Sequence, residues 1–251
     1  MEAGLHVIVE KPAGVYTKQV ERMNAVAARH PELVYCMDFN QRTNPLYKKV
    51  KDLIDSGELG EMKRVIWILT DWYRSQSYYD QGGWRATWDG EGGGVLLNQN
   101  PHNLDLWQWM CGMPKRVKSE VYYGKHRKIE VEDDLYALVE YENGATGCYI
   151  TTVGDAPGTN RLEIDGTNGK IVVENNELTF YRLRTPEPEF NATYKGGLGK
   201  PEVWECKIPI KGTYTSHPGI INNFCDCILK GAKPIAPGAE GIRGLQISNA
   251  I

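Results

Sequence analysis

The first forty residues combine two apolar runs with an amphipathic segment between them. Residues 7–9 form a continuous β-branched run, which is typical of a strand buried on both faces of a parallel sheet. Apolar positions at helical spacing predict a helix over 17–30, and a second apolar run predicts a strand over 33–37. The order indicates one β-α-β unit with residues 10–12, Glu-Lys-Pro, at the carboxyl end of its first strand. In open α/β sheets, ligands bind at that end.

The pattern changes after residue 44. An amphipathic helix is predicted over 45–56 and an alternating strand over 63–72, followed by a loop over 75–91 that is rich in Tyr, Trp and Gly. Beyond Pro114, short alternating segments are joined by turn sequences. They predict a mostly antiparallel meander with strands over 117–123, 134–141, 146–152, 161–165, 169–174, 177–183 and 203–209. Helices over 218–230 and 239–251 close the chain.

The stretch 92–114 carries the strongest candidate chemistry. Three glycines lead into a helical pattern that ends at Gly112, and a 3.6-residue period puts Asn98, His102 and Asp105 on one face. An amide, an imidazole and a carboxylate together are costly to bury without a purpose. A core histidine beside a solvent-facing Asp105 is the alternative, but the set as a whole favours a site.

Composition excludes several functions. With 41% hydrophobic and 24% charged residues the chain is typical of a globular protein, and a net charge of −3 without a basic block argues against nucleic acid or an anionic membrane as partner. No apolar run approaches the ~20 residues of a membrane span. Six scattered cysteines and no His-Glu-x-x-His sequence argue against a disulfide framework and a metal site. Reduced thiols predict a cytoplasmic protein.

Several short segments of the chain, in their order along it, resemble the glucose–fructose oxidoreductase and inositol dehydrogenase family (Gfo/Idh/MocA). Together they extend over nearly the whole chain: residues 3–12, Asn40-Gln41-Arg42, 57–60, the glycines of 92–94 leading to Asn98, His102 and Asp105, and 240–247. The resemblance implies a Rossmann domain followed by an α/β domain whose large open, mostly antiparallel sheet forms a wall of the sugar site. It also implies a homo-oligomer that assembles through this sheet.

The start of the chain departs from the family pattern. The family's Gly-rich fingerprint, which binds the dinucleotide pyrophosphate, would lie before Met1, and the last helix ends without a cap. We therefore expect a truncated protein with three parts. Residues 1–42 are the C-terminal remnant of the Rossmann domain, 43–238 the substrate-binding and oligomerisation domain, and 239–251 the start of the closing helix.

The resemblance also implies roles for individual residues. Lys11 reaches the substrate hydroxyl and the nicotinamide ribose, and His102 accepts the proton, as its near-neutral pKa allows. Asn98 stands where many relatives carry Asp, and since an amide exchanges no proton it can only hydrogen-bond substrate. Asp105 either contacts substrate or orients the helix.

Further cofactor contacts are expected beside Lys11. They are Glu10, Pro12, Arg42, Trp84 and Arg85. For Arg42 an ion pair across the domain junction is an equally good alternative, and the loop aromatics are as well explained by packing.

Two functions stay open from the sequence. The first is an NAD- or NADP-dependent dehydrogenase of a sugar, cyclitol or glycoside, an activity of the complete parent, with this chain alone inactive because it lacks the Gly-rich turn. The second is a non-catalytic carbohydrate-binding or oligomerisation fragment. The enzyme is favoured because Glu10, Lys11 and His102 are retained.

Overall fold

A small parallel sheet begins the chain. The computed structural model describes residues 1–251, and in it β1 (Val7–Val9) pairs in parallel with β2 (Tyr35–Met37). Helix α1 (Thr17–Ala28) connects the two strands, as the apolar pattern predicts. Strand β1 is only partly buried, so the prediction that both of its faces are covered is wrong for this chain.

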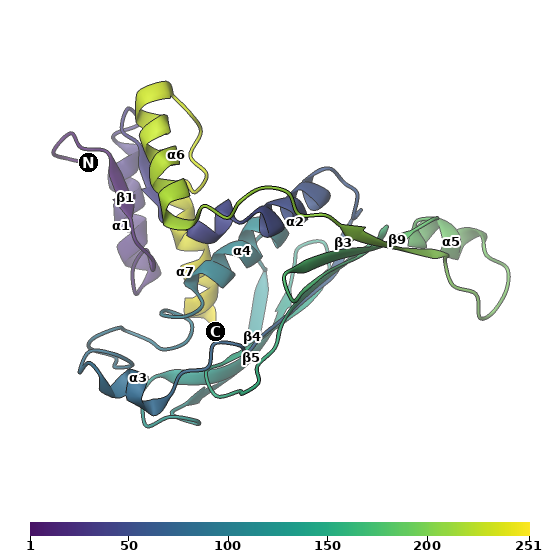
Figure 1. Cartoon of the computed structure of the whole chain (residues 1–251), viewed down its shortest axis with the longest axis horizontal. Coiled ribbons are helices and arrows are strands. Elements are labelled where there is room, and N and C mark those ends of the chain that lie inside the picture. Colours follow the sequence, from purple (N-terminus) through teal and green to yellow (C-terminus); the bar gives the residue numbers. More distant parts are fainter.

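The C-terminal helices return to this sheet. Helices α6 (Ser216–Lys230) and α7 (Gly241–Ala250) lie beside β1 and α1 in Figure 1, and the 3-10 turn η2 (Gly238–Glu240) precedes α7. Their apolar side chains join a small cluster with those of the first forty residues: Ala13, Val20, Met37, Phe39, Leu97, Ile220, Ala236 and Leu245. The predicted division at residues 42 and 238 stays a prediction, but Ile220 shows that α6 packs with the N-terminal unit.

The second sheet has eight strands. In chain order they are β3 (Met62–Leu69), β4 (Arg116–Tyr123), β5 (Glu132–Glu140), β6 (Thr146–Thr152), β7 (Asn160–Gly166), β8 (Gly169–Glu174), β9 (Glu177–Leu183) and β10 (Val203–Ile208). Their order in the sheet is β10-β9-β8-β7-β3-β6-β5-β4. The sheet is mostly antiparallel, as predicted, but it is not a simple meander. Strand β3 lies between β6 and β7 and runs parallel to β6.

Helices cover one face of this sheet. Helix α2 (Pro45–Asp55) buries Leu46 and Val50, and α4 (Pro101–Cys111) packs Trp107 onto Trp67 of β3 with ring centroids 6.5 Å apart. Two short helices, α3 (Gln76–Asp80) and α5 (Glu187–Thr193), lie in segments where we expected no helix. No helix of the chain combines the length and apolar character needed to cross a bilayer.

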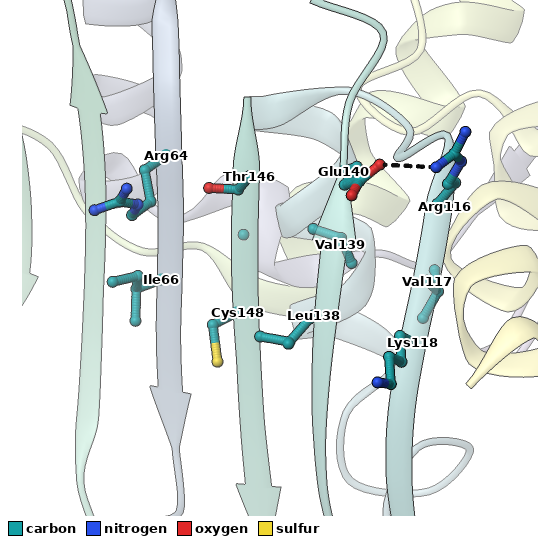
Figure 2. A pocket seen from close by; sticks show the side chains of 11 residues that line it. Arg64, Ile66, Arg116, Val117, Lys118, Leu138, Val139, Glu140, Thr146 and Cys148 are labelled. Carbon is teal, nitrogen blue, oxygen red and sulfur yellow. Dashed lines mark hydrogen bonds and ion pairs between the residues drawn. The ribbon is translucent and has the colours of Figure 1, made fainter. Parts of the chain in front are cut away.

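The opposite face is uncovered over β3, β4, β5 and β6. Figure 2 shows Ile66, Cys148 and Leu138 on three neighbouring strands of this face. They line a hollow of about 420 Å³, and Leu138 is 54% exposed. Single exposed apolar residues are normal, but a contiguous apolar patch indicates an interaction surface.

Candidate active site

A tight glycine turn leads to α4. The Gly94 N–H donates to the Glu132 carboxylate at 2.8 Å, and a Cβ on Gly94 would lie 2.0 Å from the Glu132 carbonyl oxygen. Only glycine allows this approach. The helix begins at Pro101, so Asn98 lies in the hydrogen-bonded turn before it, and the prediction of one continuous helical face from Asn98 to Asp105 is wrong.

Lys11 meets this turn from the end of β1. Its ammonium donates to the Asn98 carbonyl oxygen at 2.9 Å. Burial lowers the Lys11 pKa, and the carboxylates of Glu10 and Glu91 oppose that shift. The contact brings together two residues that are 87 positions apart in the sequence, both predicted for the site.

His102 lies in the first turn of α4 and is half-buried. Burial lowers its pKa to about 4, and the neighbouring charges of Lys11 and His217 act in the same direction. Its Nδ1 is buried without a protein partner, and its ring meets Phe39 edge-on at 6.3 Å between centroids. The expected near-neutral pKa is therefore wrong for this structure: burial makes His102 a neutral imidazole at pH 7 and a weaker base than an exposed histidine.

Glu91 is a site residue that we did not predict. Its Oε1 accepts a hydrogen bond from Asn98 Nδ2, and its Oε2 accepts one from the Ala86 N–H at 2.6 Å. The sequence shows only an acidic residue beside three glycines, and the contact depends on the fold of the loop.

Three more groups gather where the parallel strands end. The His217 Nδ1 lies 2.9 Å from Asp38 Oδ2 and 3.9 Å from Glu10, and its Nε2 lies 2.7 Å from Asn40 Nδ2. Asp38 follows β2 as Glu10 follows β1, so the carboxyl-end rule that indicated Glu10 could also have indicated Asp38. His217 comes from α6, and no local pattern links it to this edge.

Arg42 and Asp105 form a buried ion pair behind the site. Two guanidinium nitrogens contact the Asp105 carboxylate at 2.8 and 2.7 Å, and a third contacts Glu240 at 2.6 Å. Both Arg42 and Asp105 are fully buried. The ion-pair alternative for Arg42 thus matches this structure, and neither residue has a surface for cofactor or substrate. Their geometry suits a positioning role.

Trp84 and Arg85 form a separate group with the loop. The Arg85 guanidinium lies 4.6 Å from the Trp84 ring centroid and donates to the Tyr78 hydroxyl at 2.9 Å. No hydrogen bond, ion pair or cation–π contact joins them to Lys11, Asn98 or His102. Pro12 lines a small apolar hollow with Phe39 and Leu97, next to Lys11.

Comparisons with known proteins define the class. The chain is 32% identical over 249 residues to 1-carboxy-3-chloro-3,4-dihydroxycyclohexa-1,5-diene dehydrogenase of Comamonas testosteroni, covering 96% of this chain and 59% of that protein. It is 23% identical to scyllo-inositol 2-dehydrogenase (NADP(+)) of Bacillus subtilis, covering 100% of this chain and 70% of that protein. These relatives are dehydrogenases, and the chain spans between about three fifths and seven tenths of their length.

Solved structures agree with this class. The WlbA dehydrogenase of Bordetella pertussis, in complex with NADH and UDP-GlcNAcA, superposes with a TM-score of 0.80 at 25% identity, covering 100% of this chain and 69% of that one. Levoglucosan dehydrogenase in complex with NADH and levoglucosan superposes with a TM-score of 0.79 at 21% identity, covering 100% of this chain and 71% of that one. This likeness shows the fold. Residues 47–172 match the GFO/IDH/MocA C-terminal domain. The chain belongs to the GFO/IDH/MocA family.

Proposed function

We propose that this chain carries the substrate site of an NAD- or NADP-dependent oxidoreductase that acts on a hydroxyl of a sugar, cyclitol or glycoside. One observation carries the proposal: the Lys11 ammonium, which binds the Asn98 carbonyl at the end of β1, lies near enough to a neutral His102 for its charge to lower the pKa of the imidazole. Oxidation of a carbinol needs a proton acceptor and a cation for the developing alkoxide.

Each residue has a defined part in this chemistry. His102 accepts the hydroxyl proton at its ring, because its pKa of about 4 leaves the imidazole unprotonated at neutral pH. Lys11 stabilises negative charge on the substrate oxygen and holds the turn through the Asn98 carbonyl. Asn98 hydrogen-bonds the substrate, and Arg42 with Asp105 fixes the helix that carries His102.

The nicotinamide end of the cofactor fits this place. Glu10, Lys11 and Pro12 would border it at the end of β1, and half-buried His102 has a buried Nδ1 without a hydrogen-bond partner in the protein. A bound nicotinamide would supply the hydride acceptor for oxidation of the carbinol carbon. Residues 1–251 contain no Gly-x-Gly-x-x-Gly turn after a strand, so we infer that this chain alone holds a dinucleotide weakly and turns over little substrate.

A second copy of the chain is the partner we propose for the uncovered face of the large sheet. Tyr136 and Leu138 are 42% and 54% exposed on β5. In a dimer with two-fold symmetry, both residues would be buried against the same face of the second copy. The six cysteines are all free thiols, which supports the predicted reducing, cytoplasmic compartment.

The test of function is His102→Ala in an enzyme that includes these residues. We expect turnover of levoglucosan or scyllo-inositol to fall about 10²–10⁴-fold, the usual effect of losing a general base, with cofactor affinity nearly unchanged. His30→Ala, at a surface histidine paired with Glu32, is the matched control. Near-parental turnover of the His102 variant at neutral pH would contradict the assignment.

A titration separates the enzyme from the binding-fragment alternative. NADH and NADPH are added to residues 1–251 while nicotinamide fluorescence is followed. We expect no saturation at micromolar concentration, and saturation there would overturn our inference about the Gly-rich turn. If levoglucosan and scyllo-inositol bind but are not oxidised even by an enzyme that binds NADH, the non-catalytic alternative holds.

A further inference from the structure

Asn98 is held from two sides. The Lys11 ammonium binds its backbone carbonyl at 2.9 Å, and the Glu91 carboxylate binds its side-chain nitrogen Nδ2. The turn itself adds a third restraint, because the Asn98 N–H donates to the Gly94 carbonyl at 2.9 Å. The side chain is half-buried, and its Oδ1 has no hydrogen-bond partner in the protein and is not among the fully buried atoms.

The chemistry of Glu91 decides which atom that is. An ionised carboxylate only accepts hydrogen bonds, whereas the Asn amide has a donating NH₂ and an accepting oxygen. The amide must therefore turn its NH₂ group toward Glu91, which removes the usual ambiguity between the two ends of an amide. The oxygen Oδ1 receives no hydrogen bond from the protein and is left for a ligand.

Glu91 is itself fixed by its own loop. Its second carboxylate oxygen accepts the Ala86 N–H at 2.6 Å, and its backbone N–H donates to the Thr87 carbonyl at 3.0 Å. The next residue, Gly92, has a φ of +76°, and a Cβ there would lie 2.4 Å from Val15. The loop therefore delivers the carboxylate in one orientation.

We propose that Glu91 is a positioning residue that orients Asn98 so that Oδ1 accepts a hydrogen bond from a substrate hydroxyl. The site thereby selects ligands that have a donor at this position and rejects those that present only an acceptor. This inference rests on the proposed function, since it assumes a polyol beside Lys11 and His102.

Four variants test the pair. Glu91→Leu removes the acceptor, Glu91→Gln keeps an acceptor but loses the charge, and Asn98→Asp sets two carboxylates against each other. The exchange Glu91→Gln with Asn98→Asp restores a donor–acceptor contact, because the Gln NH₂ group can donate to the Asp carboxylate while the second Asp oxygen faces the site. Asp89→Asn, an exposed acidic residue of the same loop, is the control.

The first measurement needs no substrate. In a ¹⁵N-labelled chain of residues 1–251, the side-chain NH₂ signal of Asn98 is assigned by its loss in Asn98→Leu. We expect one of its protons to be shifted downfield by the charge-assisted hydrogen bond, to return to the position of a water-bound amide in Glu91→Leu, and to stay unchanged in Asp89→Asn. An unchanged signal in Glu91→Leu would overturn the positioning role.

The second measurement reads the selectivity. Levoglucosan is compared with its monodeoxyfluoro analogues, in which fluorine replaces a hydroxyl and cannot donate. In an enzyme that includes these residues, we expect the kcat/KM of one analogue to be about tenfold or more below that of levoglucosan, because Oδ1 is then left as an unpaired acceptor. In Glu91→Leu and Asn98→Leu the same analogue should differ from levoglucosan by no more than about twofold. The double variant Glu91→Gln with Asn98→Asp should again discriminate between levoglucosan and this analogue, whereas Asn98→Asp alone should not. Such a non-additive recovery is not expected of a merely structural residue.

The outcomes separate the two proposals. If levoglucosan and scyllo-inositol neither bind nor react, the proposed function fails, and the amide signal alone decides whether Glu91 positions Asn98. If levoglucosan reacts but every variant discriminates as the wild type does, the inference about Oδ1 is wrong while the proposed function stands.

Discussion

Lys11, Glu91 and His102 determine the electrostatics of the candidate site at the scale of single residues. Burial lowers the pKa of both Lys11 and His102, and the Lys11 charge lowers that of His102 further. The two groups thus disfavour each other's protonation, and Glu10 and Glu91 offset this effect only for the lysine. A neutral base beside a cation at pH 7 is the arrangement that alcohol oxidation needs.

This coupling gives a testable shift of the His102 pKa. Lys11→Met removes a neighbouring positive charge, so the pKa of His102 should rise from about 4 toward the ordinary value near 6.5. Ring-proton NMR of the chain against pH measures it, with Lys18→Met, an exposed lysine of α1, as control. A His102 titration that does not move would show that Lys11 and His102 are not coupled.

The same shift predicts how stability depends on pH. The folded-state pKa of His102 lies below its unfolded value, so the unfolded chain binds the proton more readily. The stability that neutral His102 provides is complete above about pH 6.5 and is lost as pH falls toward 4. Urea unfolding between these values should show a steeper loss for the wild type than for His102→Gln, and equal slopes would contradict the buried, neutral state.

Part of the site follows from the sequence at this scale. Lys11, Asn98 and His102 belong to short motifs, and the structure brings them together. Glu91 and His217 were missed because their side chains reach the site only through a loop conformation and a helix from the far end of the chain. Such contacts leave no periodic signal.

At the scale of elements, one ion network joins three segments. Arg42 of the 3-10 turn η1 (Asn40–Thr43), Asp105 of α4 and Glu240 of η2 meet in the interior, and Gln108 adds a hydrogen bond to Asp105 at 2.9 Å. Burial works against the Arg42 charge, but Asp105 and Glu240 outweigh it and raise the guanidinium pKa. The network fixes α4, and with it His102, against the C-terminal segment.

Breaking and replacing this pair should have different effects. Arg42→Met leaves Asp105 buried without its partner and should lower the free energy of unfolding by about 3–5 kcal/mol. The double variant Arg42→Met with Asp105→Leu removes both charges and should cost clearly less. Urea unfolding measures both, with Arg29→Met at the exposed Glu2 pair as a control expected to change stability by less than about 1 kcal/mol.

A double variant that is as unstable as the single one would contradict the buried-charge argument. If it is as stable as the wild type but the ring of His102 titrates differently, the network positions the imidazole as well as stabilising the fold. The two measurements together separate stability from positioning.

The boundaries of the strands show how much of the secondary structure a local sequence pattern predicts. The strands over 146–152, 169–174 and 177–183 match the structure to the residue, because alternation and turn residues are local signals. The insertion of β3 between β6 and β7 was not predictable, since partner choice depends on packing across the sheet. The short helices α3 and α5 span too few residues for a period to show.

At the scale of the whole molecule, the large sheet has two different faces. One face packs on α2 and α4 around Trp67 and Trp107, while on the other an exposed Leu138 and the half-buried Cys148 and Ile66 line the hollow in Figure 2. The Arg116–Glu140 ion pair at 3.5 Å lies at the edge of this hollow. An apolar centre with a charged edge is the composition of a protein–protein interface.

A single substitution at the centre of this face tests the proposed dimer. In an isologous dimer each change acts on both subunits, so Leu138→Lys would bury two unpaired ammonium groups near Arg64 and Lys118, which also line the hollow. We expect the wild type to sediment as a dimer at micromolar concentration and Leu138→Lys to raise the dissociation constant about 100-fold or more, as desolvating an unpaired charge requires. Leu198→Lys is the matched control, because Leu198 is 96% exposed and lies outside the sheet, and it should leave the dimer intact. Analytical ultracentrifugation over a range of concentrations measures all three proteins. A monomeric wild type, or an equally tight dimer of Leu138→Lys, would show that two copies do not meet through this face.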